Sequence, residues 1–240
     1  MADQKTIVVT GASHGIGAAI AQAFLDRSYR VVATARSFSQ SGFAPSPNLA
    51  LVEGDIGQAS TAENVTQTAI RQFGSIDHVV NDAGIYFSKP FTDYTIDDFR
   101  RFVSVNLEGF IFITQAAVRQ MLAQGRGGSV TTISAALAGN PIAGSPASIA
   151  MMTKGALNTA TLSLANEYAK PKIRFNAVAP GVVDSPLHKN EPEDAMTARS
   201  PMGTVTTSSD IAAAVVYLTE ASHITGQVLY VDDGAHAGKW

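Results

Sequence analysis

The sequence predicts an α/β fold in which helices flank a parallel sheet. Short runs of β-branched residues alternate along its 240 residues with longer segments of helical periodicity, which is the pattern of repeated strand–helix–strand units. Apolar residues make up 45% of the chain and charged residues 15%, a composition that supports a buried core and excludes a disordered or fibrous protein. A single domain is expected, because each glycine- and proline-rich stretch falls between a predicted strand and a predicted helix.

Seven runs rich in β-branched residues predict the strands of the sheet. They lie at 6–10, 30–34, 49–52, 77–80, 129–133, 173–178 and 227–231. Apolar residues recur at helical spacing at 16–24 and again at 99–114, and two further helices are predicted at 148–168 and 208–220. These apolar stripes are expected to face the core.

Polar residues and punctuation mark the ends of these helices and one long loop. Ser208 or Ser209 is expected to cap the last helix and Ser148 the helix before it. The segment 186–201 shows neither period and is expected to be a long mobile loop, because connections beyond about 12 to 15 residues are usually functional or disordered.

Charge and composition exclude several classes of function. The chain has 17 Lys and Arg against 20 Asp and Glu, a net charge of −3, so no basic surface for nucleic acid is expected. It has no cysteine, which excludes disulfides and thiolate chemistry. The acidic pairs at 97–98 and 232–233 are expected to be solvated, and His78, His223 and His236 to carry no site, so no metal centre is predicted. With no secretory signal and no membrane-spanning apolar run, a cytoplasmic protein without a membrane partner is expected.

A glycine-rich turn follows the first predicted strand. Residues 10–17 read Thr-Gly-Ala-Ser-His-Gly-Ile-Gly and open the first helix. Glycines there allow the backbone to approach a pyrophosphate, and the helix N-terminus offers free N–H groups and a positive dipole. The spacing Gly-x-x-x-Gly-x-Gly departs from the commoner Gly-x-Gly-x-x-Gly. Taken alone, it could also be a helix start with turn glycines.

Other motifs stand in register along the chain. They are Asn-Asp-Ala-Gly at 81–84, Ser-Val-Asn-Leu-Glu-Gly around Asn106, Ser134 at the end of the fifth strand, Pro-Gly-Val-Val-Asp-Ser-Pro at 180–186 and Ile-Thr-Gly at 224–226. In this order and at these intervals, the chain resembles the short-chain dehydrogenase/reductase family over practically its whole length. The resemblance implies a doubly wound seven-stranded Rossmann fold over 1–240, with a mobile substrate loop at about 184–203. It also implies NAD(H) or NADP(H) as cofactor and hydride transfer between nicotinamide and a carbonyl or alcohol carbon.

The same resemblance bears on which cofactor is bound. Ala35 stands where NAD-specific members carry an acid, and Arg36 follows where many NADP-dependent members carry a base. Arginine's guanidinium suits a phosphate, and His14 could add a donor, so NADP(H) is favoured. NAD(H) stays possible if Arg36 is only a solvated surface charge. The resemblance assigns further cofactor contacts to Gly11, Ser13, Gly15, Ile16, Gly17, Asp55, Ile56, Asn81, Ala83, Gly84, Pro180, Gly181, Val183 and Ser185.

The catalytic motif of the family is incomplete here. In the family a tyrosine four residues before a lysine gives the proton, a serine orients the substrate oxygen and an asparagine anchors a water. Lys154 fits the lysine, which also holds the nicotinamide ribose, and Ser134 and Asn106 fit the other two positions. Four residues before Lys154 stands Ala150, which has no proton to give. Ser134 also lies a few residues further from this position than usual, so a longer loop is expected at 139–148.

Three groups could replace the missing acid. Tyr86 lies two residues after Gly84, in a loop that borders the nicotinamide pocket in the family, although an aromatic residue that only lines the pocket is the favoured interpretation. Ser145 or Ser148, and a water held by Lys154 and Asn106, are the others. Losing a positioned acid typically costs about 100- to 10,000-fold in rate. The sequence thus favours an NADP(H)-dependent oxidoreductase of a small carbonyl or alcohol with a rearranged proton relay. The alternative is a nicotinamide-nucleotide-binding protein without turnover, such as a sensor or an assembly partner.

The resemblance implies further surfaces. Leu187, His188 and Met196 belong to the expected substrate lid. A homodimer or homotetramer is implied, in which the helices that carry Asn106 and Lys154 pack between subunits. Apolar residues available for such contacts, or equally for a monomer's core, are Phe110, Phe112, Leu157, Leu162 and Leu164. The lone tryptophan, Trp240, could dock on a neighbouring subunit.

Overall fold

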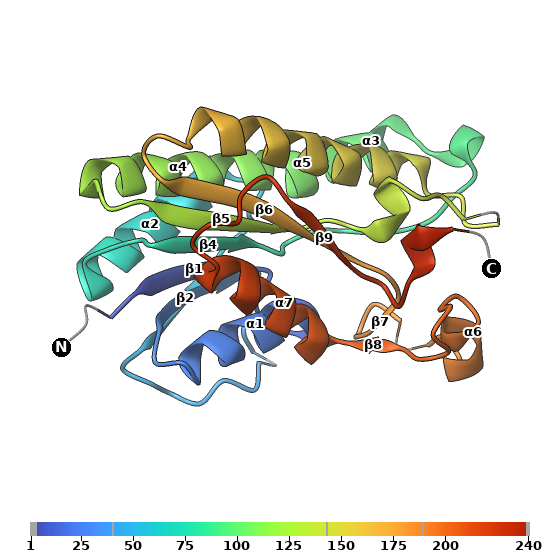
Figure 1. The fold of residues 1–240 in the computed structure, drawn as a ribbon, viewed down its shortest axis with the longest axis horizontal. Helices are drawn as coiled ribbons and strands as arrows, with labels where there is room; N and C mark the ends of the chain where they lie inside the picture. The colour runs from blue at the N-terminus through green and yellow to red at the C-terminus, as the bar shows by residue number, and fades with distance from the viewer. Residues whose placement is uncertain (1–3, 40, 143, 189, 239–240) are drawn as a thin grey trace.

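A seven-stranded sheet runs through the centre of the computed structural model, which describes residues 4–39, 41–142, 144–188 and 190–238 (Figure 1). All its strand pairs are parallel, in the order β3-β2-β1-β4-β5-β6-β9. The strands are β1 (Thr6–Thr10), β2 (Arg30–Ala35), β3 (Leu49–Glu53), β4 (His78–Asn81), β5 (Gly128–Ile133), β6 (Ile173–Pro180) and β9 (Val228–Val231). The chain builds outward from β1 to β3 and then returns to place β4 on the other side of β1. The expected doubly wound sheet is therefore confirmed. Trp240 and the first three residues lie outside the described part.

The strands read as continuous apolar runs because helices cover both faces of the sheet. All five residues of β1 are buried. Ile7 and Val9 pack with α1 (Gly15–Leu25) and α7 (Ser208–Glu220), whereas Val8 packs on the opposite face, as alternation along a strand requires. That opposite face is covered by α2 (Ala59–Phe73), α4 (Gly109–Gln124) and α5 (Ser148–Glu167) (Figure 1).

Strand boundaries differ from the expected ones by one or two residues. Strand β4 begins at His78, because the Asp77 carboxylate lies at the amino edge of the sheet and accepts hydrogen bonds there. Strand β6 continues to Pro180, and β9 begins at Val228. The last residues of β6 extend the sheet toward the loops where ligands bind in parallel sheets.

Helices account for the larger corrections. Helix α2 was not predicted from the sequence; its inner face is partly made of threonine, with Thr61 and Thr68 buried. The last helix is capped by Thr207 in a capping box with Asp210, so Ser208 and Ser209 already lie within it. Ser148 opens α5 without capping it, since the residue at the N-cap is Ala147.

The segment after β6 contains short elements of secondary structure. It contains β7 (Val183–Asp184), α6 (Glu193–Thr197) and β8 (Thr206–Thr207), and β7 pairs with β8 in a small second sheet. This pairing joins the two ends of the expected lid to each other, and within the described residues of 186–201 only the short α6 is regular; the mobility of this segment stays a prediction. No helix in the described ranges is both long and apolar enough to cross a membrane.

The stripe expected at 99–114 spans three consecutive elements. It begins in α3 (Ile96–Phe102), continues through a π-helical segment (Val103–Glu108) and ends in α4. The wider π-helical turn lies where Asn106 occurs, and such turns are frequent at functional sites.

Candidate functional site

A cavity of about 600 Å³ opens at the carboxyl ends of the parallel strands, the place where doubly wound sheets bind ligands. It extends from the loops after β1, β2 and β3 to the lid after β7 and the C-terminal segment. The residues expected from the sequence that line it are Gly11, Ser13, His14, Gly15, Ile16, Arg36, Asp55, Ile56, Ala83, Gly84, Tyr86, Ser134, Ser145, Lys154, Pro180, Gly181, Val183, Ser185, Leu187 and His188. Gly17, Asn81, Asn106, Ser148 and Met196 do not line it.

The glycine loop forms one wall of the cavity. Gly11 and Gly15 have φ of 69° and 58°, values that glycine adopts without strain. A Cβ on Gly17 would lie 2.5 Å from the Gly11 carbonyl oxygen and 2.6 Å from Asp82 Oδ2. Gly17 therefore permits close packing behind the cavity wall. Helix α1 begins after His14 without a side-chain cap, so its first-turn N–H groups lack helical partners, as at an anion-binding helix terminus.

The two asparagines lie behind the cavity, where both line a separate void of about 10 Å³. Asn81 donates from Nδ2 to Thr114 Oγ1 at 3.0 Å. Asn106 Oδ1 accepts from the Ile85 N–H at 2.8 Å, and its Nδ2 donates to the Ile85 carbonyl at 3.2 Å and to Thr153 Oγ1 at 2.9 Å. Asn106 thus fixes both polar groups of the Ile85 backbone, immediately before Tyr86.

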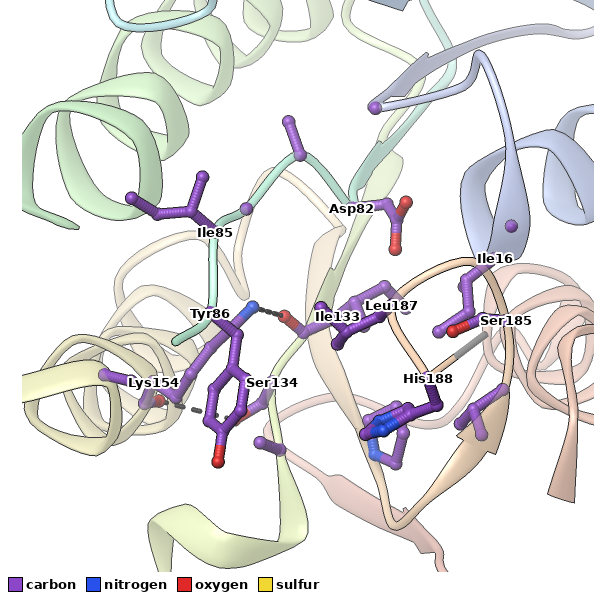
Figure 2. A pocket seen from close by; sticks show the side chains of 18 of the residues that line it. Ile16, Asp82, Ile85, Tyr86, Ile133, Ser134, Lys154, Ser185, Leu187 and His188 are labelled. Carbon is purple, nitrogen blue, oxygen red and sulfur yellow. Dashed lines mark hydrogen bonds between the residues drawn. The ribbon is translucent and has the colours of Figure 1, made fainter. Parts of the chain in front are cut away.

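Lys154 and Ser134 lie together on one wall of the cavity (Figure 2). Lys154 Nζ donates to the Ile133 carbonyl oxygen at 2.7 Å, and Ser134 Oγ donates to the Lys154 carbonyl oxygen at 3.3 Å. A Cβ on Gly84 would lie 3.3 Å from Lys154 Nζ and 3.4 Å from Asn106 Oδ1. The missing side chain at Gly84 therefore lets the lysine ammonium reach the loop that ends β4.

A partly buried carboxyl that was not predicted from the sequence, Asp82, lines the cavity with this lysine and interacts with its charge. Burial raises the pKa of Asp82 to about 7, although the charge of Lys154 and the Gly17 N–H both act to lower it. Burial likewise lowers the pKa of Lys154, against the effect of Asp82. The sequence signal that could have identified Asp82 was its position in the 81–84 motif, directly after a buried strand. The pair concentrates titratable charge beside the glycine loop.

Tyr86 packs against the cluster that contains Ala150, four residues before Lys154. Ala150 is 1% exposed, in a cluster with Phe102 and Ile149 against which Tyr86 packs. Figure 2 shows the Tyr86 ring pointing into the cavity that Lys154 and Ser134 line. Burial raises the pKa of the phenol, and the charge of Glu191 adds to this while that of Arg199 opposes it. The phenol is therefore protonated at neutral pH and has a proton to give.

Several lining residues went unrecognised in the sequence. His236 lines the cavity and contacts Asp232, which is 5% exposed, so the expectation that Asp232 is solvated was wrong. Asp98 is likewise buried, in the capping box of α3. Arg199 also lines the cavity, whereas Met196, expected in the substrate lid, is buried within α6 and does not line it. Within the described residues, no three His, Cys, Asp or Glu side chains are grouped to hold a metal ion.

Comparisons with known proteins agree in fold and in chemical class. A family model described as enoyl-(acyl carrier protein) reductase matches residues 11–236. An L-rhamnose 1-dehydrogenase (NAD(P)(+)) of Sphingomonas sp. (strain SKA58) is 33% identical over 246 residues, covering 97% of this chain and 96% of that protein. The ligand-free aldohexose dehydrogenase of Thermoplasma acidophilum is 30% identical with a TM-score of 0.89, covering 98% of this chain and 95% of that one. ElxO with NADP bound is 27% identical with a TM-score of 0.90, covering 98% of this chain and all (100%) of that one.

Proposed function

From its membership of the short-chain dehydrogenase/reductase family, to which this chain belongs, we propose that it is an NADP(H)-dependent oxidoreductase with a rearranged proton relay. It transfers a hydride to or from a carbon of a small carbonyl or alcohol. The observation that carries the proposal is the continuity of the cavity. A single space of about 600 Å³ joins the glycine loop and Arg36 at one end to Lys154 and Ser134 at the other.

The polar groups along this space fit a nicotinamide dinucleotide. First-turn N–H groups of α1 suit its diphosphate, Asp55 its adenine and Lys154 its nicotinamide ribose. Bound there, the nicotinamide supplies or accepts the hydride. NADP bound to ElxO and the NAD(P)(+) of the rhamnose dehydrogenase name support a cofactor of this class.

Arg36 selects NADP(H) in this proposal. Its side chain is exposed at the cavity rim beside Ala35, and no acid stands at either position. An exposed guanidinium binds a 2′-phosphate and tolerates its solvation. Arg36→Asp should weaken NADP(H) binding about 10- to 100-fold, because it replaces attraction by repulsion, and should spare NAD(H). Arg71→Asp, at an exposed arginine away from the cavity, is the charge-matched control. An unchanged dissociation constant for NADPH in Arg36→Asp would refute the assignment.

Tyr86 is the proton donor of the proposed relay. The phenol donates the proton on its Oη to the substrate oxygen. Ser134 orients that substrate oxygen, and Lys154 supplies positive charge beside the reacting atoms. Asn106 acts as a positioning residue, since its two hydrogen bonds hold Ile85 and hence the adjacent Tyr86. The small side chain of Ala150 leaves room for the Tyr86 ring, which packs against the cluster that contains Ala150.

The relay is tested by steady-state turnover of NADPH with a panel of small carbonyls, and of NADP⁺ with alcohols. Tyr86→Phe should lower kcat about 100- to 10,000-fold, as loss of a positioned acid does, and leave NADPH binding intact. Tyr217→Phe, at a tyrosine 56% exposed on α7, is the control. Full activity in Tyr86→Phe would assign the proton to another group, such as Ser145 or a water. NADPH binding without turnover on any compound, with turnover appearing in Ala150→Tyr, would favour the nucleotide-binding protein without reaction.

A homodimer or homotetramer completes the proposal. Ile111, Met152 and Leu162 leave 43%, 58% and 56% of their surface exposed on α4 and α5, which supports helix packing between subunits. Phe110 and Leu157 are instead buried in the chain's own interior. Light scattering at low concentration measures the state, and a monomer would contradict this part alone.

A further inference from the structure

Two histidines backed by carboxylates line the lid side of the cavity. They are His236, in a 3₁₀ turn after β9, and His188, in the lid. The sequence separates them widely, and the mechanism proposed above uses neither. Each has its Nδ1 within hydrogen-bond distance of a carboxylate oxygen, and no hydrogen bond to either Nε2 occurs among the described residues.

His236 is held on three sides. Its Nδ1 lies 3.0 Å from both oxygens of Asp232, its own backbone N–H donates to Asp232 Oδ2 at 2.8 Å, and its ring stacks on Tyr230 at 3.9 Å between centroids. A carboxylate only accepts hydrogen bonds, so Nδ1 must carry the proton. The Nε2 of a neutral His236 is then an acceptor fixed on the side away from Asp232. The same arrangement orients histidines in many sites where imidazole binds a ligand.

His188 shows the same chemistry on the lid. Its Nδ1 lies 2.7 Å from Glu191 Oε2, and the other oxygen of Glu191 lies 2.7 Å from Arg199. Figure 2 places His188 across the cavity from Tyr86. The Glu191 carboxylate thus compensates the one guanidinium that, among the described residues, lines this end of the cavity. An anionic substrate would find Arg199 already paired with Glu191 and, of the described residues, only Lys154 left as a cation at this end, and a purely apolar one would leave both Nε2 atoms without partners.

We propose that His188 and His236 bind hydroxyl groups of an uncharged, polyhydroxylated substrate of the sugar or polyol class. The inference rests on the proposed function, because it names the substrate of that same site. Apolar neighbours such as Ile85, Ile142 and Leu187 line the same space and suit the C–H faces of such a molecule, while the fixed imidazoles discriminate by accepting its O–H groups.

The test compares matched substrates in wild type and variants. Aldopentoses, aldohexoses and their alditols represent the proposed class, cyclohexanol an apolar alcohol, and hexuronates an anionic sugar. With NADP⁺, the best sugar or alditol should exceed cyclohexanol in kcat/KM at least about 10-fold. His236→Phe and His188→Phe should each lower that ratio about 10-fold, mainly through KM. His236→Gln should restore part of it, because its amide oxygen can accept. His223→Phe, away from the cavity, is the control.

Binding without turnover separates this inference from the proposed function. Calorimetry of the same compounds with the protein–NADPH complex should give heat with sugars or alditols that His236→Phe abolishes, even if no hydride is transferred. Preference for hexuronates or for cyclohexanol, or an equal KM increase for all classes in the variants, would overturn the substrate class while leaving the oxidoreductase intact. Absence of both binding and turnover with every sugar and alditol would also overturn it.

Discussion

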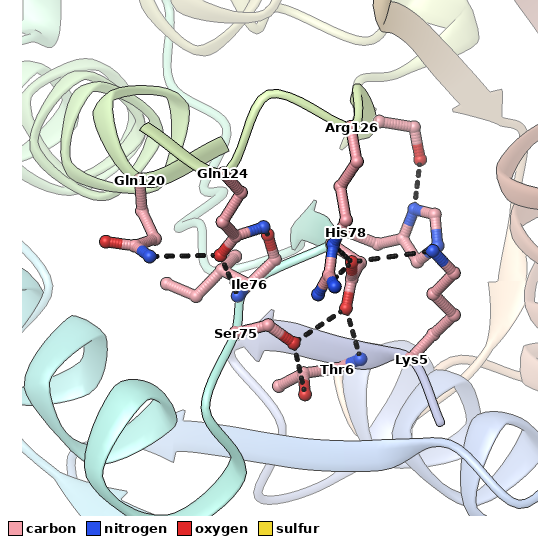
Figure 3. A network of polar contacts seen from close by, with 10 residues as sticks. Lys5, Thr6, Ser75, Ile76, His78, Gln120, Gln124 and Arg126 are labelled. Carbon is pink, nitrogen blue, oxygen red and sulfur yellow. Dashed lines mark hydrogen bonds and ion pairs between the residues drawn. The ribbon is translucent and has the colours of Figure 1, made fainter. Parts of the chain in front are cut away.

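Two carboxyls flank the same strand, one buried and one partly buried, and their pKa values move in opposite directions. Asp77 precedes β4 at the amino edge of the sheet, and Asp82 follows it at the carboxyl edge. Burial acts to raise the pKa of Asp77, but the Thr6 N–H, the Ser75 hydroxyl and the charges of Lys5 and Arg126 outweigh it, so the pKa is lowered (Figure 3). Burial of Asp82 is not outweighed, and its pKa is raised.

The difference separates a structural site from a site prepared for a ligand. At the amino edge, cations of the chain itself compensate the negative charge of Asp77: Arg126 lies 3.0 Å and Lys5 3.6 Å from its Oδ1. At the carboxyl edge, Lys154 and Asp82 are both desolvated beside a large cavity and neither is fully compensated. Perturbed groups of the second kind cluster at functional sites. Changes at the amino edge should therefore affect folding, and those at the carboxyl edge cofactor and catalysis.

The largest effect is expected for Lys154→Met. The substitution keeps the side-chain stem and removes the charge, so kcat/KM should fall about 100- to 10,000-fold. The free energy of unfolding should change by less than about 1 kcal/mol, because loss of a desolvated charge offsets loss of its hydrogen bond to the Ile133 carbonyl. Activity assays and urea unfolding measure the two effects. Lys170→Met, at an exposed lysine near the end of the same helix, is the matched control. A large loss of stability would place Lys154 with the structural groups.

Asp77→Asn and Asp82→Asn form the direct comparison of the two edges. The Asp77→Asn substitution leaves Lys5 and Arg126 without this anion, so the free energy of unfolding should fall by about 2 kcal/mol. The Asp82→Asn substitution keeps an acceptor for the Gly17 N–H and removes a costly desolvated carboxyl, so its change should stay below about 1 kcal/mol. Urea denaturation gives both values. Equal destabilisation by the two substitutions would remove the distinction between the edges.

The amino edge also predicts a pH dependence of stability through His78. Burial lowers the pKa of His78 from 6.5 to about 4, with Arg174 and Lys5 acting the same way and Asp77 opposing. Below about pH 6.5 the His78 side chain therefore binds a proton in the unfolded chain but not in the folded protein. The free energy of unfolding consequently falls as pH decreases toward 4. Between pH 7.5 and 5, the free energy of unfolding should fall by about 2 kcal/mol more in wild type than in His78→Asn. Asp82, with a raised pKa, contributes with the opposite sign in both proteins and cancels. Parallel pH profiles of the two proteins would contradict the assignment.

The smallest effect concerns cofactor affinity and pH. The Asp82 carboxyl, with its pKa near 7, becomes charged beside the glycine loop as pH rises from 6 to 8. A negative charge there opposes a bound diphosphate, so the dissociation constant for NADPH should rise a few-fold more over this range in wild type than in Asp82→Asn. Fluorescence titration of NADPH at several pH values measures it. Identical pH profiles would show that Asp82 stays in one protonation state.

The sequence predicted the sheet and the glycine loop but missed one helix and misplaced a helix cap. The parallel sheet and the glycine loop were predicted because periodicity and glycine spacing are local signals, readable at Gly11 or along β1. Helix α2 was missed because its buried face includes threonines, which weaken the apolar stripe that reveals a helix. The cap of the last helix, expected at Ser208 or Ser209, lies one or two residues earlier at Thr207, a common error at helix ends.

The substrate end of the cavity depends on contacts that no local pattern contains. Arg199 affects the pKa of Tyr86 from a distant part of the sequence, and His236 reaches the cavity only because β9 is the last strand added to the sheet. The sequence did contain Asp232 and His236 at a spacing of one helical turn. Nothing in that spacing told a cavity-lining pair from a solvated one.

Calorimetric titration of NADPH and NADH into the wild-type protein tests the central claim most directly, since every proposed role depends on a dinucleotide at the carboxyl edge. We expect one site per chain with NADPH bound at least about 10-fold more tightly than NADH, because Arg36 meets the extra phosphate. Absence of heat with both nucleotides would contradict the account.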